Sequence, residues 1–232
     1  MTDLTNAIVL VTGANGGLGA EFVQQALDRG AAKVYATART PRTWDDERIV
    51  PLALDVTSQE SVDAAARAAA DTTIVVNNAG IAGADPLVDT SVAEVERIFA
   101  TNVFGALRVA KAFAPSIGGG ALIDVHSALS WVALAGAYSA SKAAFWSITN
   151  SLRLELAPQG TQVVGAHLSY TDTGMTAGLD VEKSDPADIV RLIWDAVEAG
   201  EHEVLADQVS RDVRAGLSAP LAALYPALAA TV

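Results

Sequence analysis

The stretch Gly136-Ala-Tyr138-Ser-Ala-Ser-Lys142 places a phenol and an ammonium group four residues apart. On a helix, side chains at this spacing lie one above the other on the same face, so Lys142 can stand beside the Tyr138 hydroxyl. A nearby positive charge favours phenolate, so we expect the pKa of Tyr138 to fall below its ordinary value of about 10. The pair could then give and take a proton near neutral pH. An amphipathic tyrosine on a core helix would show the same spacing, so the rest of the chain must decide.

A glycine-rich turn follows the first predicted strand. Residues 7–12, Ala-Ile-Val-Leu-Val-Thr, form an apolar run typical of a parallel strand that is buried on both faces. Gly13, Gly17 and Gly19 come next, and residues 20–29 then show apolar side chains at helical spacing. This is the context in which free N–H groups at a helix start hold the phosphates of a nucleotide. A tight structural turn is the alternative explanation.

The end of the second predicted strand, residues 33–37, bears on which dinucleotide is bound. An acidic residue about 20 positions beyond the glycines bonds the ribose hydroxyls of NAD, whereas an arginine accommodates the 2′-phosphate of NADP. The chain has Ala38 here, followed by Arg39, with Arg42 close behind. This favours NADP(H), with NAD(H) as the alternative. Arg39 could also be a solvated loop cation.

Polar residues also follow the third and fourth predicted strands. Residues 50–54 lead into Asp55, whose carboxylate could bond the adenine amino group or cap the alanine-rich helix predicted over residues 58–70. Residues 73–77 run into Asn78-Ala79-Gly80. Amides at a strand end can link neighbouring strands, and a glycine there lets a cofactor approach the backbone.

The fifth predicted strand, residues 121–126, ends at Ser127. Ligands bind at the carboxyl ends of the strands in open α/β sheets. Ser127 is therefore a candidate to hydrogen-bond a carbonyl group. Leu129, Trp131 and Val132 follow closely enough to form an apolar pocket beside it.

Asn102 lies in the middle of a long helix predicted over residues 92–113. Asparagine is a mediocre helix former, and inside a helix it either faces solvent or bonds something specific. Its neighbours Phe99, Val103 and Ala106 are apolar. We therefore expect a buried and hydrogen-bonded Asn102.

The rest of the chain continues to alternate helices and strands. The helix that begins near Tyr138 and runs to about residue 157 is apolar on more than one side, as expected for a helix buried by its own domain or by a partner subunit. A strand is predicted over residues 162–168, a loop over 177–185, a helix over 186–199 and a strand over 203–205. Neither an internal repeat nor a domain boundary is visible.

Composition and charge exclude several classes of function. The 232 residues are 51% apolar and 18% charged, which is typical of one domain with a large core. A net charge of −12 argues against nucleic acids and anionic membranes as partners. Without cysteine there is no disulfide framework, thiol nucleophile or thiolate metal site. With no signal-like start and no run of eighteen apolar residues, we expect a cytoplasmic protein.

Taken together, the motifs resemble a classical short-chain dehydrogenase/reductase. The resemblance covers roughly residues 6–205. It rests on Thr12-Gly13-x-x-x-Gly17-x-Gly19, Asp55, Asn77-Asn78-Ala79-Gly80, Asn102, Ser127 and Tyr138-x-x-x-Lys142. Each motif is weak alone, but their joint order is specific.

The resemblance implies an α/β fold with a Rossmann-type, doubly wound parallel sheet. Seven strands in the order 3-2-1-4-5-6-7 would carry helices on both faces, in a three-layer α/β/α arrangement. We expect one domain over residues 1–232, with a cofactor half at about 1–115 and a catalytic and substrate half at about 116–232. The family also implies a homodimer or homotetramer.

The resemblance gives each matched residue a role. Ser127 would bond the substrate oxygen, Tyr138 would give that oxygen a proton as hydride arrives from the nicotinamide, and Lys142 would hold the nicotinamide ribose. Asn102 would anchor a water that links Lys142 to solvent. The residues expected to bind the cofactor are Gly13, Asn15, Gly17, Leu18, Gly19, Arg39, Thr40, Asp55, Val56, Asn78, Ala79, Gly80, Tyr138, Lys142, Thr171 and Thr173.

The chain departs from the family pattern in three places. Tyr138 stands eleven residues after Ser127, one or two fewer than is common, so the loop between them must be tighter and Ser130 becomes a rival for the hydroxyl role. Leu168-Ser169 stands where the family usually has Pro-Gly. The loop after Met175 is short and could leave the substrate pocket open.

No metal site is predicted. His126, His167 and His202 lie far apart in the sequence and show no ligand spacing, so structural or surface positions are expected for them.

The sequence therefore predicts an NADP(H)-dependent carbonyl reductase. It would reversibly convert a small apolar ketone or aldehyde to the alcohol through Asn102, Ser127, Tyr138 and Lys142. An NAD-dependent alcohol dehydrogenase that works oxidatively is the alternative within the same class. A dinucleotide sensor without turnover is the alternative from another class, and the complete tetrad counts against it because a sensor needs neither Tyr138 nor Lys142.

Overall fold

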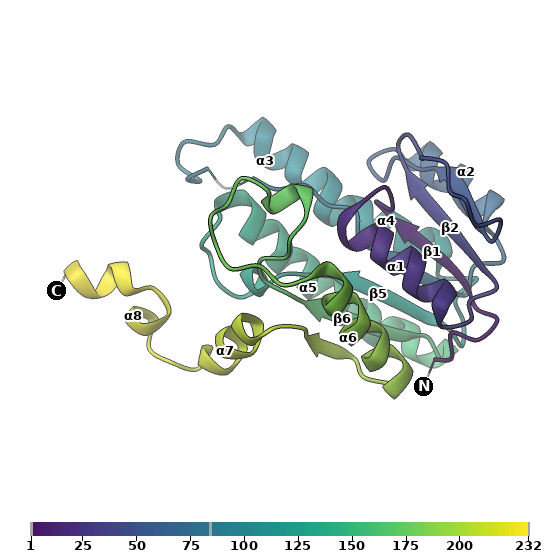
Figure 1. Cartoon of the computed structure of the whole chain (residues 1–232). Helices are drawn as coiled ribbons and strands as arrows, with labels where there is room; N and C mark the ends of the chain where they lie inside the picture. The colour runs from purple at the N-terminus through teal and green to yellow at the C-terminus, as the bar shows by residue number, and fades with distance from the viewer. Residues whose placement is uncertain (1, 84, 232) are drawn as a thin grey trace.

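Seven parallel strands form one sheet in the order β3-β2-β1-β4-β5-β6-β7 (Figure 1). The computed structural model describes residues 2–83 and 85–231. The strands are β1 Ile8–Thr12, β2 Lys33–Ala38, β3 Ile49–Ala53, β4 Ile74–Asn77, β5 Ala121–Val125, β6 Gln162–His167 and β7 Glu203–Leu205. The order and the parallel pairing confirm the predicted Rossmann-type fold class.

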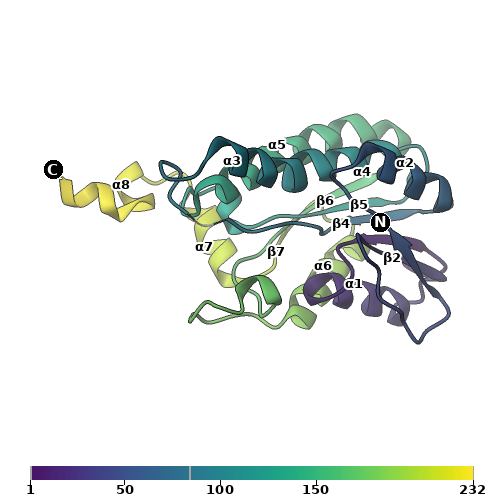
Figure 2. The same cartoon turned by 90° about the horizontal axis from the view of Figure 1, so that it is seen from above.

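Helices cover both faces of this sheet, which is why the central strands are apolar on both sides (Figure 2). The α-helices are α1 Gly17–Asp28, α2 Gln59–Ala68, α3 Val92–Phe99, α4 Ala106–Phe113, α5 Gly136–Leu156, α6 Pro186–Ala199, α7 Gln208–Gly216 and α8 Leu221–Leu224. Helices α1 and α6 bury one core, in which Phe22 and Trp194 meet edge to face at 5.6 Å. Helices α2, α4 and α5 bury the other core, around Phe113 and Leu122.

The strand order reverses between β1 and β4, and this reversal positions the site. The chain leaves β1 toward α1 on one face of the sheet and returns through helices on the other face after β4. The loops that follow these two strands therefore diverge and leave a crevice at the carboxyl ends. Strand β5, which lies next to β4, carries Ser127 to the same edge.

The helix predicted over residues 92–113 is present but interrupted. Between α3 and α4 the chain forms one stretch of π-helix, η1 Ala100–Gly105, which contains Asn102. The wider π-helical turn directs the Asn102 side chain into the protein, where it forms hydrogen bonds with the backbone of Ile81. At the start of α2, Ser58 accepts the N–H of Ser61, so the alternative that Asp55 caps this helix is wrong.

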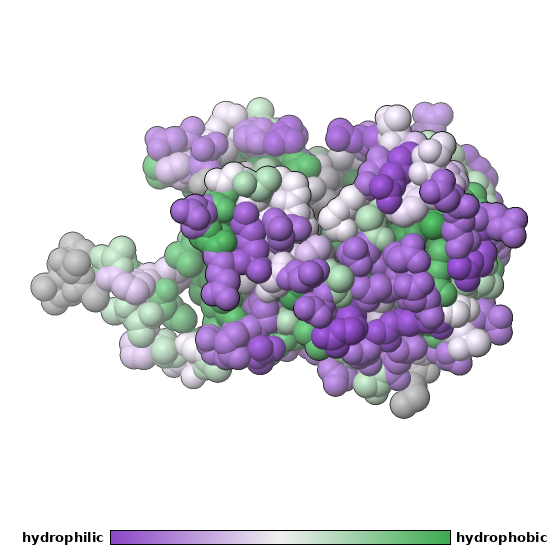
Figure 3. Space-filling model, in the orientation of Figure 1, coloured by the Kyte–Doolittle hydropathy of each residue, from purple (hydrophilic) through white to green (hydrophobic). Residues whose placement is uncertain are grey.

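The C-terminal segment leaves the body of the domain. Helix α7 packs beside the 3₁₀ turn η2 Ala128–Ser130, whereas α8 and η5 Pro226–Thr231 extend away from the sheet (Figures 1 and 3). Tyr225 returns toward the domain, and its hydroxyl accepts the N–H of Ala133 at 3.1 Å. None of the helices in the described part of the chain has the length and apolar character needed to cross a membrane.

The turn that starts β5 gives a test of the fold. A Cβ atom at Gly120 would lie 1.8 Å from the carbonyl oxygen of Thr73, so Gly120→Ala must push β5 away from β4. We expect this variant to lose about 1–3 kcal/mol of unfolding free energy in urea titrations. Gly118→Ala is the matched control, because its Cβ would meet only the Gln159 carbonyl oxygen at 3.6 Å. Equal losses in both variants would contradict this account.

Candidate active site

A cavity of about 640 Å³ opens at the carboxyl edge of the sheet. The turn between β1 and α1 forms one side of it, and Ser127, Tyr138 and Lys142 line another. The phenol and the ammonium predicted to act together therefore face the same space as the glycine turn. The segment after β6 contributes Thr171 and Thr173.

The glycine turn is held against β4 by side-chain hydrogen bonds. The Asn78 amide donates to the Thr12 carbonyl at 2.9 Å, and the Thr12 hydroxyl accepts the N–H groups of Asn78 and Ala79 at 3.0 Å each. The predicted link between neighbouring strands is thus present. A Cβ atom at Gly19 would lie 2.2 Å from the carbonyl oxygen of Gly13, so the close approach of helix and turn requires glycine.

The start of α1 fits the phosphates of a dinucleotide. Gly16 precedes the helix in an extended conformation, and no side chain caps the helix start. A Cβ atom at Gly16 would meet nothing within 4 Å, so this backbone faces the open cavity. Free N–H groups and the positive end of the helix dipole point where a pyrophosphate would lie.

The predicted cofactor residues divide into two groups. Those that line the cavity are Gly13, Gly17, Leu18, Asn78, Ala79, Gly80, Tyr138, Lys142, Thr171 and Thr173. Asn15, Gly19, Arg39, Thr40, Asp55 and Val56 lie outside it. In this second group the Asn15 amide donates to the Thr40 carbonyl at 2.8 Å, and the exposed Arg39 acts electrostatically on Asp55.

Ser127 rather than Ser130 faces the phenol. The Ser127 side chain interacts with the Tyr138 hydroxyl and also accepts the N–H of Leu129 at 3.1 Å. The Ser130 hydroxyl instead accepts the N–H of Ser127 at 3.4 Å, and Ser130 lines a separate cavity. Of the two serines that the sequence left open, Ser127 is the one beside the phenol.

The protonation of Tyr138 differs from the expectation. Burial raises the pKa of Tyr138 to about 12, and the Ser127 hydroxyl opposes this only in part. Lys142 does not lower the pKa of Tyr138, because its Nζ donates to the Val125 carbonyl at 2.8 Å and stands 5.8 Å from the centre of the tyrosine ring. Burial also lowers the pKa of Lys142 to about 8. At pH 7 the pair is a neutral phenol beside an ammonium.

Asn102 is buried and hydrogen-bonded, as expected. Its Oδ1 accepts the N–H of Ile81 at 2.9 Å, and its Nδ2 donates to the Ile81 carbonyl at 3.0 Å and to the Ser141 hydroxyl at 3.1 Å. Ser141 in turn donates to the Tyr138 carbonyl at 2.7 Å. Asn102 therefore joins the loop after β4 to the first turns of α5, a link through Ser141 that the sequence pattern did not reveal.

Residues 7–184 match the family model described as short chain dehydrogenase, which is well over half of the chain. The chain belongs to the short-chain dehydrogenase family. It is 34% identical over 198 residues to the short-chain dehydrogenase cctT of Talaromyces islandicus, which covers 79% of this chain and 67% of that protein. It is also 32% identical over 223 residues to an uncharacterized oxidoreductase of Staphylococcus aureus strain N315, which covers 87% of this chain and 95% of that protein.

Solved short-chain dehydrogenases share the whole fold. One from Burkholderia cenocepacia J2315, solved in complex with NADP, superposes with a TM-score of 0.91 at 35% identity and covers 98% of this chain and 99% of its own. Another from Sphingobium yanoikuyae, in complex with NADPH, gives 0.79 at 27% identity, with 90% and 92% covered.

The apolar half of this dehydrogenase's cavity was predicted only in part. Leu129 and Val132 line it as expected, whereas Trp131 does not. The apolar residues that sequence reasoning missed are Leu134, Leu168, Tyr170, Met175, Leu179, Val209 and Val213. Val209 and Val213 are four residues apart in α7, and this spacing is the signal that marks one helix face in the tail.

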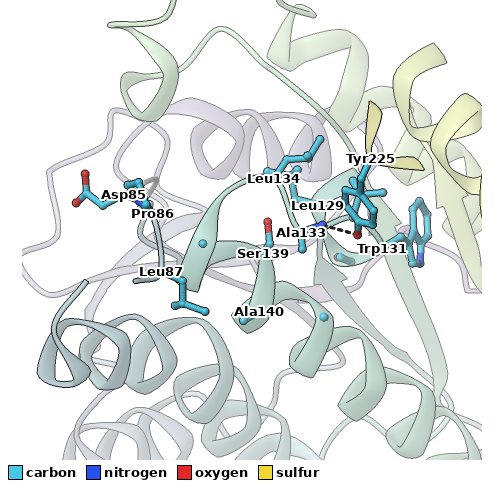
Figure 4. Close-up of a pocket in the computed structure, with 14 residues that line it drawn as sticks. Asp85, Pro86, Leu87, Leu129, Trp131, Ala133, Leu134, Ser139, Ala140 and Tyr225 are labelled. Atoms are coloured by element: carbon cyan, nitrogen blue, oxygen red, sulfur yellow. Dashed lines mark hydrogen bonds between the residues drawn. The ribbon is translucent and has the colours of Figure 1, made fainter. Parts of the chain in front are cut away.

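A second cavity of about 480 Å³ lies on the other side of the loop between Ser127 and Tyr138 (Figure 4). Leu129, Val132 and Leu134 line both cavities, so this loop is the wall between them. Tyr225 braces the wall from outside through its bond to Ala133.

Two of the histidines are structural, as predicted. His126 and His167 are buried and stack at 4.9 Å, and Trp131 stacks on His167 at 4.0 Å. Burial lowers the pKa of both imidazoles far below the ordinary value, so both are neutral. Among the described residues, no three His, Asp or Glu side chains are grouped to hold a metal ion.

Asn102 gives a test of how the site is held. Asn102→Ala leaves the N–H and carbonyl of Ile81 without their side-chain partner, so we expect a loss of about 1–3 kcal/mol in unfolding free energy. Thr101→Ala, on the same π-helical stretch, removes only a 3.4 Å contact with the Arg97 carbonyl and should change stability by less than about 0.5 kcal/mol. Chemical denaturation measures both, and similar values would argue against the anchoring role.

Proposed function

We propose that this short-chain dehydrogenase uses NADP(H) to reduce an apolar ketone or aldehyde to the alcohol. The observation that carries the proposal is the shared cavity, in which Ser127, Tyr138 and Lys142 face the glycine turn at the start of α1. The site thus offers hydroxyl groups for a carbonyl oxygen opposite a backbone surface that fits a dinucleotide.

Two features support NADP(H) over NAD(H). Arg39 follows β2 without an acidic residue beside it, and its side chain is exposed toward solvent, where a 2′-phosphate could reach it. The similar dehydrogenases from Burkholderia cenocepacia and Sphingobium yanoikuyae were solved with NADP and NADPH.

In the proposed reaction, the bound nicotinamide supplies the hydride that adds to the carbonyl carbon. Ser127 bonds the carbonyl oxygen, and Tyr138 breaks its O–H bond to give that oxygen a proton. The phenolate that remains takes a proton back from solvent. In this direction the neutral phenol acts as the acid, and in the reverse direction, oxidation of an alcohol, the phenolate would act as the base.

Asn102 has little capacity left for the water proposed to link Lys142 to solvent. Both hydrogens of its amide are used by Ile81 and Ser141, and its oxygen accepts one bond. A relay water would therefore donate to the second lone pair of Oδ1.

The lining of the cavity supports an uncharged substrate. Lys142 is the only charged side chain among the described residues that line it, and His126 there is neutral. The far wall consists of Leu168, Met175 and Val209 with other apolar side chains. A carboxylate or phosphate on the substrate would find no arginine there.

We also propose a homodimer or homotetramer. The outer face of α5 exposes the small residues Ala140, Ala143 and Ser147, beside Leu154 at 77% exposure. A helix face of this kind packs closely against another helix. A cytoplasmic location and a division into a cofactor half and a substrate half remain proposals from the sequence.

Substitution of Tyr138 tests the chemistry. Tyr138→Phe should lower kcat for NADPH-dependent reduction of an aryl ketone at least about 100-fold, while NADPH binding measured by fluorescence stays within about twofold. Tyr170→Phe is the matched control, because Tyr170 lines the same cavity but is 44% exposed and lies outside α5, and it should keep near-normal turnover. Near-normal turnover of Tyr138→Phe would refute the mechanism. Cofactor binding without consumption of any carbonyl in a broad panel would instead favour the sensor.

Substitution of Arg39 tests the cofactor. Arg39→Asp should lower the ratio of kcat/KM for NADPH to that for NADH by about 10-fold or more, because one charge-assisted contact with the 2′-phosphate is lost. Arg67→Asp makes the same change in net charge on the exposed end of α2 and should leave the ratio unchanged. A wild-type enzyme that prefers NADH would establish the NAD-dependent alternative.

A further inference from the structure

A buried carboxylate that the proposed reaction does not use lies directly behind the site. Asp124 is in β5, three residues before Ser127, and its exposed fraction is 0%. Its Oδ1 accepts the Asn77 amide at 2.9 Å, and its Oδ2 accepts the Thr149 hydroxyl at 2.7 Å. Both oxygens are therefore bonded, and neither donor carries a charge.

Asp124 and Lys142 both lie in the contact between β5 and α5, where their charges act on each other without a direct bond. Side chains alternate along a strand, so Asp124 and His126 face α5 whereas Val125 faces the opposite core. On α5, Lys142 and Thr149 are seven residues apart and lie on one face. Lys142 Nζ donates to the carbonyl of Val125, the residue next to Asp124. The buried ammonium of Lys142 is thus bonded to the residue that directly follows the buried carboxylate of Asp124 in β5.

Burial makes each of these charges depend on the other. An ionised group far from water is strongly unfavourable unless an opposite charge is near. Lys142 is the only lysine or arginine among the described residues that is buried. Besides Lys142, the charge that acts on Asp124 is that of Arg153, and the charge of Lys142 in turn acts on the buried imidazoles of His126 and His167. The imidazoles are neutral, and Arg153 is partly exposed, with its guanidinium bonded to the His202 carbonyl at 2.7 Å.

We propose that ionised Asp124 is a positioning residue that keeps Lys142 protonated and its ammonium seated against β5 while the enzyme works. The consequence for catalysis rests on the proposed function, in which the ammonium holds the cofactor ribose. The charge pair itself belongs to the ligand-free protein.

The titration of the two groups supports this assignment. Burial lowers the pKa of Lys142 to about 8, and the charge of Asp124 opposes that fall. Burial raises the pKa of Asp124 to about 6, and the bonds from Thr149 and Asn77 and the charge of Lys142 oppose that rise. Between these two values both groups are ionised. Below them Asp124 takes up a proton, and above them Lys142 loses one.

The test is a pH titration of the four lysines, monitored by ¹³C NMR on protein that is labelled at the lysine ε-carbons. The Lys142 signal is assigned by its loss in Lys142→Arg. In the wild-type protein we expect the Lys142 signal to show its main inflection near pH 8 and a smaller one near pH 6, where Asp124 takes up its proton. A single inflection would overturn the proposal, and this measurement needs no variant of Asp124.

Asp124→Asn should lower the main Lys142 midpoint, because the variant loses the charge of Asp124 that opposes the fall in the pKa of Lys142. Asp71→Asn is the matched control, because Asp71 pairs with Lys33 at 2.6 Å on the surface and should move only the Lys33 signal. An unchanged Lys142 midpoint in Asp124→Asn would overturn the proposal.

Kinetics then separate this proposal from the proposed function. In Asp124→Asn the alkaline limb of the kcat/KM profile should move to lower pH by the same amount as the Lys142 midpoint. A shifted midpoint with no carbonyl turnover by the wild-type protein would refute the function and leave the charge pair standing. Turnover with an unmoved alkaline limb would refute the positioning role alone.

Discussion

The packing of α5 on β5 is the contact on which the site depends. It buries Lys142 against the Val125 carbonyl and holds Tyr138 at the wall of the cavity. The same contact buries Lys142 and partly buries Tyr138, and burial is the main cause of both pKa shifts. At neutral pH the phenol is therefore neutral, and the amine stays cationic although burial lowers its pKa.

The framework around that contact could be predicted because it follows local rules. Strand ends, glycine turns and caps each leave a short-range signature, which is why the seven strands and the bonded Asn102 were expected from residue types and spacing. The link from Asn78 to β1 was expected for the same reason, since an amide at a strand end has few other partners.

The features that could not be predicted depend on contacts between distant segments. A four-residue spacing shows that Tyr138 and Lys142 share a helix face, but it does not show how far each is removed from water. Asp124 looks like an ordinary polar residue in an apolar strand until Asn77 and Thr149 are placed on either side of it. Val209 reaches the cavity only because α7 folds back beside η2.

The short connection between Ser127 and Tyr138 shows how such distant contacts shape the cavity. With few residues to span the gap, the loop turns sharply at Gly136, where φ is +44° and a Cβ atom would lie 2.4 Å from the Asp85 carbonyl oxygen. Tyr225 supports the same loop from the C-terminal segment. The wall of the cavity is thus held by residues from the loop after β4 and from the C-terminal segment. Changes in either segment can therefore reshape the pocket without touching Ser127, Tyr138 or the glycine turn.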